Sequence, residues 1–292
     1  MQQDVYTLDK ARVRASFERA ACGYDAAAVL QKEVRARMLA RLDYVKLAPH
    51  HILDVGSGTG HAARTLAARY TGSHVVALDI ALGMLRLAAA GQPWWRRFTQ
   101  QRQSELCADM ENLPLAAASM DLVWSNLAIQ WSNDLDRTFA EMARVLRPDG
   151  LLTFSTFGPD TLKELREAAL ADPQYVHVSR FIDMHDIGDA LVRAGFAAPV
   201  LDVERFVLTY DDVLGVMRDL KAIGANNAAQ GRRRGLEGKG FLQNLAQRYE
   251  PFRDNGKLPA TFEVVYGHAW KADAPAAKLP DGGSVIKLYP RK

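Results

Sequence analysis

Residues 52–60 constrain the fold of this chain more than any other stretch. Ile52, Leu53 and Val55 surround an acid, Asp54, and lead directly into glycines at positions 56, 58 and 60. Residues 61–70 then have the pattern of a helix. Glycine lets the backbone turn sharply and lacks the Cβ that would keep a ligand away. A strand, a glycine turn and a helix in this order are therefore typical of a nucleotide-binding site, with a plain glycine turn as the alternative.

The spacing of the glycines limits the class of ligand that the loop can bind. A dinucleotide-binding loop has glycine at its first, third and sixth positions, whereas the sixth position here is His61. The loop also lacks the lysine of a Walker loop, which binds phosphates. The pattern therefore favours a ligand without pyrophosphate, such as S-adenosylmethionine. The loop residues expected to bind it are Asp54, Gly56, Ser57, Gly58 and Gly60.

Composition excludes several classes of protein. Of the 292 residues, 48% are apolar and 24% are charged, as is ordinary for a soluble globular protein. No apolar run approaches the roughly 20 residues that span a bilayer, and the first residues lack a secretion-signal pattern. Cys22 and Cys107 are too few for a disulfide framework or a metal cluster. A net charge of +3 is too weak to imply nucleic acid. We expect a cytoplasmic protein without a bound metal that contacts neither membrane nor nucleic acid.

Strands and helices alternate beyond the glycine loop. Short apolar runs predict strands at 74–79, 104–108, 120–125 and 151–156, with helices at 80–90 and 136–146. Such alternation implies an α/β fold, a parallel sheet with helices on both faces. Helices at 160–169 and 187–194 and strands at 200–209 and 260–270 are expected to follow. The turn at 148–150 is expected to end a helix.

The alternating core has additions on both sides. Residues 9–42 predict two helices with a break at 23–25, either a packing pair or a lid over the edge where ligands bind. We divide the chain into five parts: an N-terminal helical lid at 1–46, a ligand-binding α/β core at 47–210, a helical insertion at 211–257, the last strand of the core at 258–271 and a flexible tail at 272–292.

Polar residues follow successive predicted strands. Asp79 lies 25 residues after Asp54, where an acid can accept hydrogen bonds from both hydroxyls of a ribose; the alternative is a cap for the helix beginning at Ile80. Asp109 can accept a hydrogen bond from an exocyclic amine while Met110 flanks an adenine ring. The alternative is that Asp109 is an acid in a surface turn. Asn126 can point an amide donor and an acceptor into the same crevice.

Together these positions resemble the motif pattern of class I S-adenosylmethionine-dependent methyltransferases. The resemblance implies a Rossmann-like, seven-stranded and mostly parallel sheet with an antiparallel last strand, an N-terminal helical lid and a helical insertion before that strand. The resemblance also implies three further contacts with the cofactor. They are Ile80, Met84 and Gln31, the last beside the methionine part.

Four stretches outside the general motif resemble the BioC family, the malonyl-acyl-carrier-protein O-methyltransferases of biotin synthesis. They are Ser16-Phe17-Glu18-Arg19-Ala20-Ala21 with Asp9, Lys10 and Tyr24; Leu127-Ala128-Ile129-Gln130-Trp131; Phe154-Ser155-Thr156-Phe157-Gly158-Pro159-Asp160-Thr161-Leu162; and Leu258 to Trp270, which includes Tyr-Gly-His-Ala-Trp. The likeness runs from about residue 9 to 271. Phe157 is a departure, because leucine is expected there. The resemblance implies transfer of a methyl group to the free carboxylate of a malonyl thioester on an acidic carrier protein.

This chemistry can be checked against the residues. A malonyl carboxylate is already ionised at pH 7, so no general base is needed and no histidine is assigned that role. Rate must come from alignment and from removing water around the carboxylate. We expect a closed site with aromatic walls and few polar donors. Its predicted residues are Phe17, Tyr24, Gln130 and Trp131, where Tyr24 has a packing role as its alternative.

The insertion carries a run of basic residues. Arg232, Arg233, Arg234 and Lys239 form a compact positive segment that we expect to steer an acidic carrier protein. A solvated charge run is the commoner case. An arginine of this run that binds the malonyl carboxylate itself is a further alternative.

Three other functions compete with this interpretation. A methyltransferase fold can serve an accessory or hydroxylating protein, as in the assembly factor of respiratory complex I, which is expected to carry a mitochondrial targeting segment. A nucleic-acid methyltransferase would need a broader basic face. A small-molecule carboxyl methyltransferase acting on free acids also fits the motifs.

Overall fold

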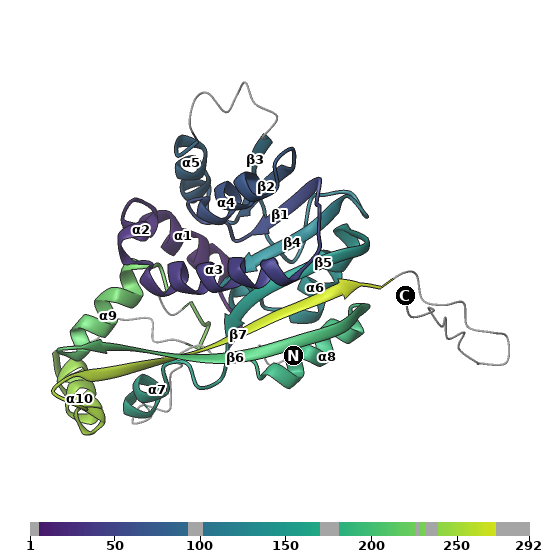
Figure 1. Ribbon diagram of the computed structural model, residues 1–292. Helices are drawn as coiled ribbons and strands as arrows, with labels where there is room; N and C mark the ends of the chain where they lie inside the picture. Colours follow the sequence, from purple (N-terminus) through teal and green to yellow (C-terminus); the bar gives the residue numbers. More distant parts are fainter. Residues whose placement is uncertain (1–5, 93–101, 170–180, 226–227, 232–238, 273–292) are drawn as a thin grey trace, which may run out of the picture.

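The computed structural model describes residues 6–92, 102–169, 181–225, 228–231 and 239–272. It contains a seven-stranded sheet in the order β3-β2-β1-β4-β5-β7-β6 (Figure 1). Strands β1 to β5 are parallel, and β7 is antiparallel to both β5 and β6. The strands are β1 His51–Val55, β2 His74–Asp79, β3 Arg102–Cys107, β4 Met120–Asn126, β5 Leu146–Phe157, β6 Phe196–Tyr210 and β7 Leu258–Lys271. The predicted fold class, including the antiparallel last strand, is confirmed.

The central strands are apolar on both faces. Successive residues of a strand point to opposite sides, and in β1 the side chain of Ile52 joins one hydrophobic cluster while that of Leu53 joins another. Neither side chain is exposed. This is why the core strands have continuous apolar runs instead of alternating ones.

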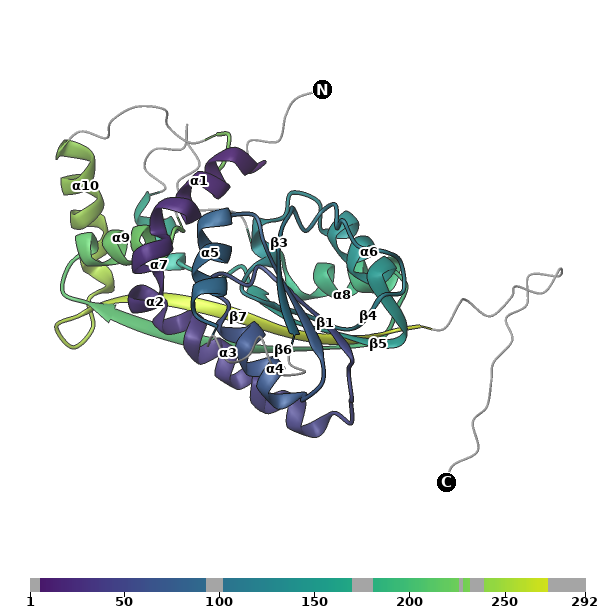
Figure 2. The same cartoon turned by 90° about the horizontal axis from the view of Figure 1, so that it is seen from above.

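Helices cover both faces of the sheet. In Figure 2, α3 and α4 lie on one side of the central strands and α6 and α8 on the other. Helices α7, α9 and α10 add buried side chains to the cluster of α3 and α4. The core helices are α4 His61–Arg69, α5 Leu82–Ala90, α6 Leu135–Val145, α7 Lys163–Ala169 and α8 Met184–Arg193. No helix among the described residues has both the length and the apolar character needed to cross a bilayer.

Two element boundaries differ from the prediction for identifiable reasons. Helix α5 begins at Leu82, because Asp79 first forms a turn in which its Oδ1 accepts from the amide of Ala81 at 2.9 Å. Strand β5 begins at Leu146, before the predicted turn at 148–150. This turn lies within the strand as an irregularity, where the register with β4 shifts.

The N-terminal helices run from the sheet face to the carboxyl edge of the parallel strands. They are α1 Lys10–Ala20, α2 Tyr24–Ala27 and α3 Val29–Arg41. The predicted break lies at a short 3-10 helix, Ala21–Gly23, and a second break follows at Ala28. Three side chains of α3, Leu30, Val34 and Met38, are buried against the sheet. Helix α3 is therefore part of the core, whereas α1 and α2 lie beside the strand ends.

The described residues between β6 and β7 include two α-helices, as predicted for the insertion. They are α9 Val213–Ala222 and α10 Lys239–Tyr249. Tyr249 is fully buried and its hydroxyl donates to the carbonyl of Pro259 at 2.9 Å. Helix α10 is thus fastened to the start of β7. The arginines at 232–234 lie outside the described residues, and the side chain of Lys239 is not described.

Candidate active site

A cavity at the carboxyl edge of the sheet brings most of the predicted site residues together. The predicted residues that line it are Phe17, Tyr24, Gln31, Gly56, Gly58, Asp79, Ile80, Met84, Asp109, Met110, Asn126, Gln130 and Trp131. A second hollow adjoins it and shares Tyr24, Gln31, Gly56, Gly58 and Asn126. Asp54 and Ser57 line that second hollow. Gly60 lines neither, and is instead the left-handed residue that begins α4.

Two of the three loop glycines, Gly56 and Gly60, leave no room for a Cβ because of neighbouring protein atoms. Gly56 has a φ of +72°, and a Cβ there would lie 2.3 Å from the Cβ of Ala128. Gly60 has a φ of +78°, and its Cβ would lie 2.7 Å from that of Ala88. Only at Gly58 is the space toward the cavity open, with Tyr24 at 3.9 Å. The expectation that each glycine makes room for a ligand is therefore too simple.

Asp79 ties the loop to the next strand. Its Oδ2 accepts from the amide of Gly58 and its Oδ1 from that of Ala81, both at 2.9 Å. Burial raises the pKa of this carboxyl to about 6, although the backbone amides of Ala81, Gly58 and Ile80 oppose that rise. The first turn of α5 also receives Glu18, whose Oε2 accepts from the amide of Gly83 at 2.8 Å. Asp79 therefore orders the start of α5 and also faces the cavity.

Asp54 is a buried acid whose Oδ2 has no hydrogen-bond partner among the described residues. Asp54 is the last residue but one of β1, and its side chain lines the second hollow, where the Oγ of Ser57 is also buried without a partner among the described residues. Burial raises the pKa of Asp54 to about 7, and the nearby charge of Asp79 adds to the rise. Buried polar atoms in proteins are almost always hydrogen-bonded. These two atoms indicate a polar ligand in the second hollow.

Arg35 is a site residue that the sequence analysis missed. It lines the second hollow from α3, and its positive charge lowers the pKa of Asp54. Burial lowers the pKa of Arg35 itself, but an arginine stays protonated in proteins. Its spacing from Gln31 was an available signal, because residues four apart lie on one face of a helix. The second hollow thus carries a carboxylate, Asp54, that suits an ammonium group, and a guanidinium, Arg35, that suits a carboxylate. These are the two charged groups of an amino acid.

The side chain of Asn126 has a protein partner at each of its polar ends. Its Nδ2 donates to the carbonyl of Gln31 at 3.1 Å, and its Oδ1 accepts from the hydroxyl of Ser155 at 3.0 Å. The amide does line both hollows, but it also joins α3 to strands β4 and β5. The prediction that both polar ends of this side chain serve a ligand in the crevice stays a prediction, because each end also has a protein partner. One amide hydrogen and one lone pair remain for a ligand.

Aromatic rings form the wall of the cavity away from the glycine loop. Phe17 and Trp131 contact each other edge to face, with ring centroids 5.3 Å apart. Phe157 lines the same cavity, so the position where the sequence departs from leucine carries a site residue. Ile223 and Ala225 also line it, which the sequence analysis did not predict. The helical insertion therefore reaches the cavity through the end of α9.

Two polar side chains add hydrogen-bond donors to the cavity: Tyr24, beside Gly58, and Gln130, which precedes Trp131. Burial, with the charges of Asp79 and Asp25, raises the pKa of Tyr24 well above its usual value, so its hydroxyl stays protonated. Gln130 donates from Nε2 to the carbonyl of Leu127 at 2.7 Å. Leu127 itself has a φ of +49°, which is strained for a leucine and typical of functional turns. No cluster of three metal-ligating side chains occurs in the described part of the chain.

Comparison with known proteins identifies the family. Residues 53–154 match the family model described as a methyltransferase domain. The malonyl-[acyl-carrier protein] O-methyltransferase of Methylovorus sp. strain MP688 is 66% identical over 292 residues, which cover 100% of this chain and 98% of that protein. The chain belongs to the malonyl-[acyl-carrier protein] O-methyltransferase family. The protein of that name from Gallionella capsiferriformans is 56% identical over 97% of each chain. The resemblance found in the sequence is thereby confirmed.

Solved structures agree on the fold of this family member. The YcgJ protein of Bacillus subtilis has a TM-score of 0.58 at 17% identity and covers 81% of this chain and 98% of its own. A methyltransferase described as putative, from Bacillus halodurans, has a TM-score of 0.59 at 17% identity and covers 82% and 99%. At such identities the likeness concerns the fold alone.

A stretch that carried the family resemblance has a structural role. The amide of Asp160 donates to Oε2 of Glu263 at 2.9 Å, and the hydroxyl of Thr161 donates to the carbonyl of the same residue at 3.0 Å. A Cβ at Gly158 would lie 2.5 Å from that carboxylate. The Gly-Pro-Asp-Thr sequence therefore fastens the turn after β5 to β7, next to Phe157 in the cavity wall.

Proposed function

We propose that this protein transfers the methyl group of S-adenosylmethionine to the free carboxylate of a malonyl thioester carried by acyl carrier protein, as a step of biotin synthesis. The observation that carries the proposal is the 66% identity, over its whole length, to a malonyl-[acyl-carrier protein] O-methyltransferase. The cavity supports it, because it combines acids at the strand ends with an aromatic wall. A cytoplasmic location remains part of the proposal.

The residues of the two hollows fit S-adenosylmethionine. Asp79 would accept from the ribose hydroxyls, and Asp109 with Met110 and Ile80 would surround the adenine. The second hollow would hold the amino-acid end, with its ammonium at Asp54 and its carboxylate at Arg35. The unpartnered Oδ2 of Asp54 supports this orientation, since an ammonium would complete its hydrogen bonding.

The reaction neutralises charge, and the cavity suits that change. When bound, S-adenosylmethionine supplies a methyl group activated by a sulfonium. The malonyl carboxylate oxygen forms the new bond to carbon as the bond to sulfur breaks, so an anion and a cation become an ester and a thioether. The rings of Phe17, Trp131 and Phe157 exclude water, which favours a transition state less charged than the reactants. Tyr24, whose raised pKa keeps the hydroxyl protonated at neutral pH, would donate to the carboxylate and orient it.

Methylation of the carrier-bound substrate tests this function. We expect purified protein with labelled S-adenosylmethionine and malonyl-acyl carrier protein to give a base-labile methyl ester. Malonyl-coenzyme A and free malonate serve as comparison substrates. Binding of the cofactor without transfer to any malonyl thioester would contradict the function and favour an accessory role. Faster transfer to free malonate would favour a small-molecule methyltransferase.

Charge reversal of the arginine run tests carrier docking. Changing Arg232, Arg233 and Arg234 together to glutamate is expected to raise KM for malonyl-acyl carrier protein by roughly 10-fold or more, since electrostatic steering by a basic surface would become repulsion. KM for malonyl-coenzyme A should change much less. The matched control is reversal of three arginines that are exposed outside this run, Arg12, Arg193 and Arg218. An equal rise in KM for both thioesters would contradict a docking role of the arginine run.

Cofactor affinity is expected to rise with pH. The folded pKa values of about 7 for Asp54 and about 6 for Asp79 lie above the ordinary range, so binding to their ionised forms releases protons. Between pH 5.5 and 7.5 the dissociation constant should fall by about 10- to 100-fold. Over the same range these groups should lower the stability of the cofactor-free protein, because the folded state holds protons that the unfolded state has released. Titration calorimetry in two buffers would measure the proton release.

The variant Asp54→Asn provides the control for this pH dependence. It cannot ionise, so its affinity should be weaker at pH 7.5 and should change less with pH. A wild-type affinity that is constant from pH 5.5 to 7.5 would contradict the assignment of both carboxyls to the cofactor.

A further inference from the structure

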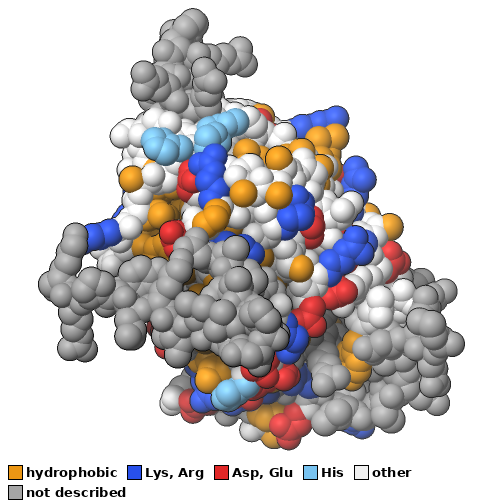
Figure 3. Space-filling model, turned by 90° about the vertical axis from the view of Figure 1, so that its right-hand side faces the viewer, with side chains coloured by type: hydrophobic (Ala, Val, Ile, Leu, Met, Phe, Trp, Pro, Cys, Tyr) orange, Lys and Arg blue, Asp and Glu red, His pale blue; other side chains and the backbone are white. Residues whose placement is uncertain are grey.

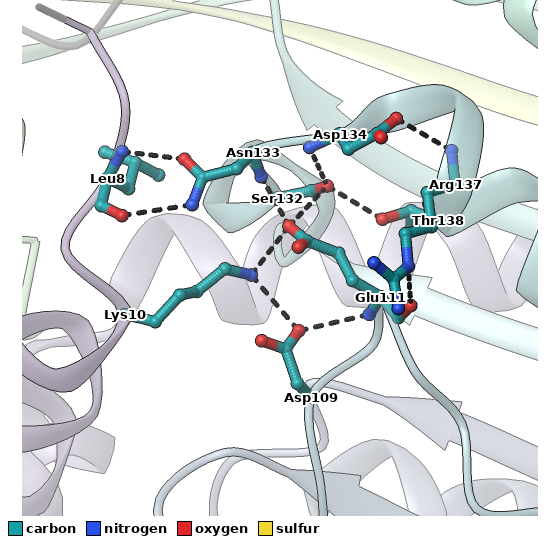
Figure 4. Close-up of polar contacts among 9 residues, drawn as sticks. All are labelled: Leu8, Lys10, Asp109, Glu111, Ser132, Asn133, Asp134, Arg137 and Thr138. Carbon is teal, nitrogen blue, oxygen red and sulfur yellow. Dashed lines mark hydrogen bonds and ion pairs between the residues drawn. The ribbon is translucent and has the colours of Figure 1, made fainter. Parts of the chain in front are cut away.

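Residues 7–9 form a strap that passes beside the cavity before α1 begins at Lys10. The side chain of Asn133 holds its main chain by both ends: Oδ1 accepts from the amide of Leu8 at 2.7 Å, and Nδ2 donates to the carbonyl of Leu8 at 3.0 Å (Figure 4). The amide of Asp9 also donates to the carbonyl of Ala228 at 2.9 Å. The strap is thus fixed to two segments far from it in the sequence, and Lys10 follows directly.

Lys10 lies between two acids of the loop after β3. Its Nζ is 2.8 Å from Oε1 of Glu111 and 3.1 Å from Oδ1 of Asp109 (Figure 4). Glu111 is itself fixed, because its Oε1 also accepts from the amide of Asn133 at 2.5 Å and from the hydroxyl of Ser132 at 3.1 Å. Burial alone would raise the pKa of Glu111, but Lys10 and the amide of Asn133 hold it below the usual value. The ammonium is therefore placed by an anchored partner.

Asp109 is held by one of its two oxygens. Oδ1 accepts from Lys10 and from the amide of Glu111, each at 3.1 Å. Oδ2 makes no hydrogen bond with any described residue. The carboxylate lines the cavity together with Met110 and Ile80. One oxygen is thus saturated by protein donors, whereas the other can accept from a ligand.

We propose that Lys10 is a positioning residue for recognition of the adenine base: it fixes Oδ1 of Asp109, so that Oδ2 accepts from the exocyclic 6-amino group. This inference rests on the proposed use of S-adenosylmethionine. Without the ammonium, the two carboxylates at 109 and 111 would repel each other, and rotation of Asp109 would relieve the repulsion. The oxygen that distinguishes an amino group from an oxo group would then lose its fixed direction.

A comparison of two ligands isolates this role. S-adenosylhomocysteine has a 6-amino donor, whereas S-inosylhomocysteine has a 6-oxo acceptor that a fixed carboxylate disfavours. Wild-type protein is expected to prefer the adenosyl ligand by roughly 10- to 100-fold in Kd, as for a hydrogen bond to a charged group. Lys10→Met should reduce this preference by about 10-fold, and Lys10→Arg should retain most of it. Titration calorimetry measures all the dissociation constants.

Two further variants separate positioning from general stabilisation. Asn133→Ala removes the two hydrogen bonds to Leu8 but keeps the ammonium of Lys10 and its partner Glu111, so the preference should fall by less than in Lys10→Met. Asp109→Asn should lose the preference, and adding Lys10→Met to it should have little further effect on the ratio. An unchanged ratio in Lys10→Met would overturn the role of Lys10 even if both ligands bound more weakly.

Failure of this inference is distinguishable from failure of the proposed function. Both measurements need only cofactor-product binding and do not involve malonyl-acyl carrier protein. If the protein binds S-adenosylhomocysteine with the expected preference but transfers no methyl group, the adenine inference stands and the proposed substrate is wrong. A wild-type protein without any preference between the two ligands would overturn the inference at Asp109 itself.

Discussion

Replacing Asp79 with alanine is expected to weaken S-adenosylmethionine binding by about 100-fold or more. Two hydrogen bonds from ribose hydroxyls to an ionised, buried carboxylate would be lost, each worth about 1.5–3 kcal/mol. The variant also leaves the amides of Gly58 and Ala81 without their acceptor. Binding would be measured by titration calorimetry at a temperature where circular dichroism shows the variant to be folded.

Asp121 offers a matched control for the loss of backbone contacts. Its Oδ2 accepts from the amides of His50 and His51, both at 2.8 Å, at the edge where the parallel strands begin. Figure 3 looks onto this edge, away from the cavity, and shows acidic and basic side chains interspersed. Asp121→Ala should lower the melting temperature to a similar extent while leaving cofactor affinity within about threefold. A similar loss of affinity in both variants would count against a direct ribose contact at Asp79.

Gly56→Ala is expected to destabilise the protein by about 2–5 kcal/mol. An alanine at a φ of +72° costs about 1–2 kcal/mol, and forcing its Cβ to 2.3 Å from that of Ala128 adds roughly 1–3 kcal/mol of overpacking. Relief requires movement of the turn after β4, so cofactor binding should weaken as well. Urea denaturation monitored by circular dichroism measures the loss of stability.

Two companion variants separate strain in the backbone from the contact with Ala128. Gly72 has a φ of +87°, and nothing lies within 4 Å of the Cβ that alanine would add, so Gly72→Ala should show only the conformational part. The double variant Gly56→Ala with Ala128→Gly should recover most of the difference between the two single variants. Equal destabilisation by Gly56→Ala and Gly72→Ala would contradict the packing argument.

The fold and the position of the site were predictable because they depend on local patterns. Alternating strands and helices dictate a parallel sheet, and the carboxyl ends of parallel strands meet at one edge. Asp54, Asp79 and Asp109 therefore had to lie near each other, and the structure places all three around the two adjoining hollows. Gln130 and Trp131, which the family resemblance predicted, line the same cavity.

Contacts between distant segments were not predictable in this way. The amide of Asn126 could point in either direction from its strand end, and the carbonyl of Gln31, 95 residues away, decides where its donor lies. The spacing of Arg35 from Gln31 indicates a shared helix face, but only the docking of α3 brings that face to Asp54. The glycines at 56 and 60 were predicted to make room for a ligand, but tertiary packing assigns that space to Ala128 and Ala88.

The sequence by itself determined the sheet, the edge at which a cofactor would bind and the family of the enzyme, since each depends on residue patterns along short stretches. Only the tertiary structure decided how individual polar groups are used. Lys10 illustrates the difference: its partner Asp109 is 99 residues away, and Asn133 holds the strap at Leu8 across 125 residues. Which oxygen of Asp109 remains available is a consequence of these contacts, because hydrogen-bonding capacity is settled by the neighbours that the fold supplies and not by the residue type.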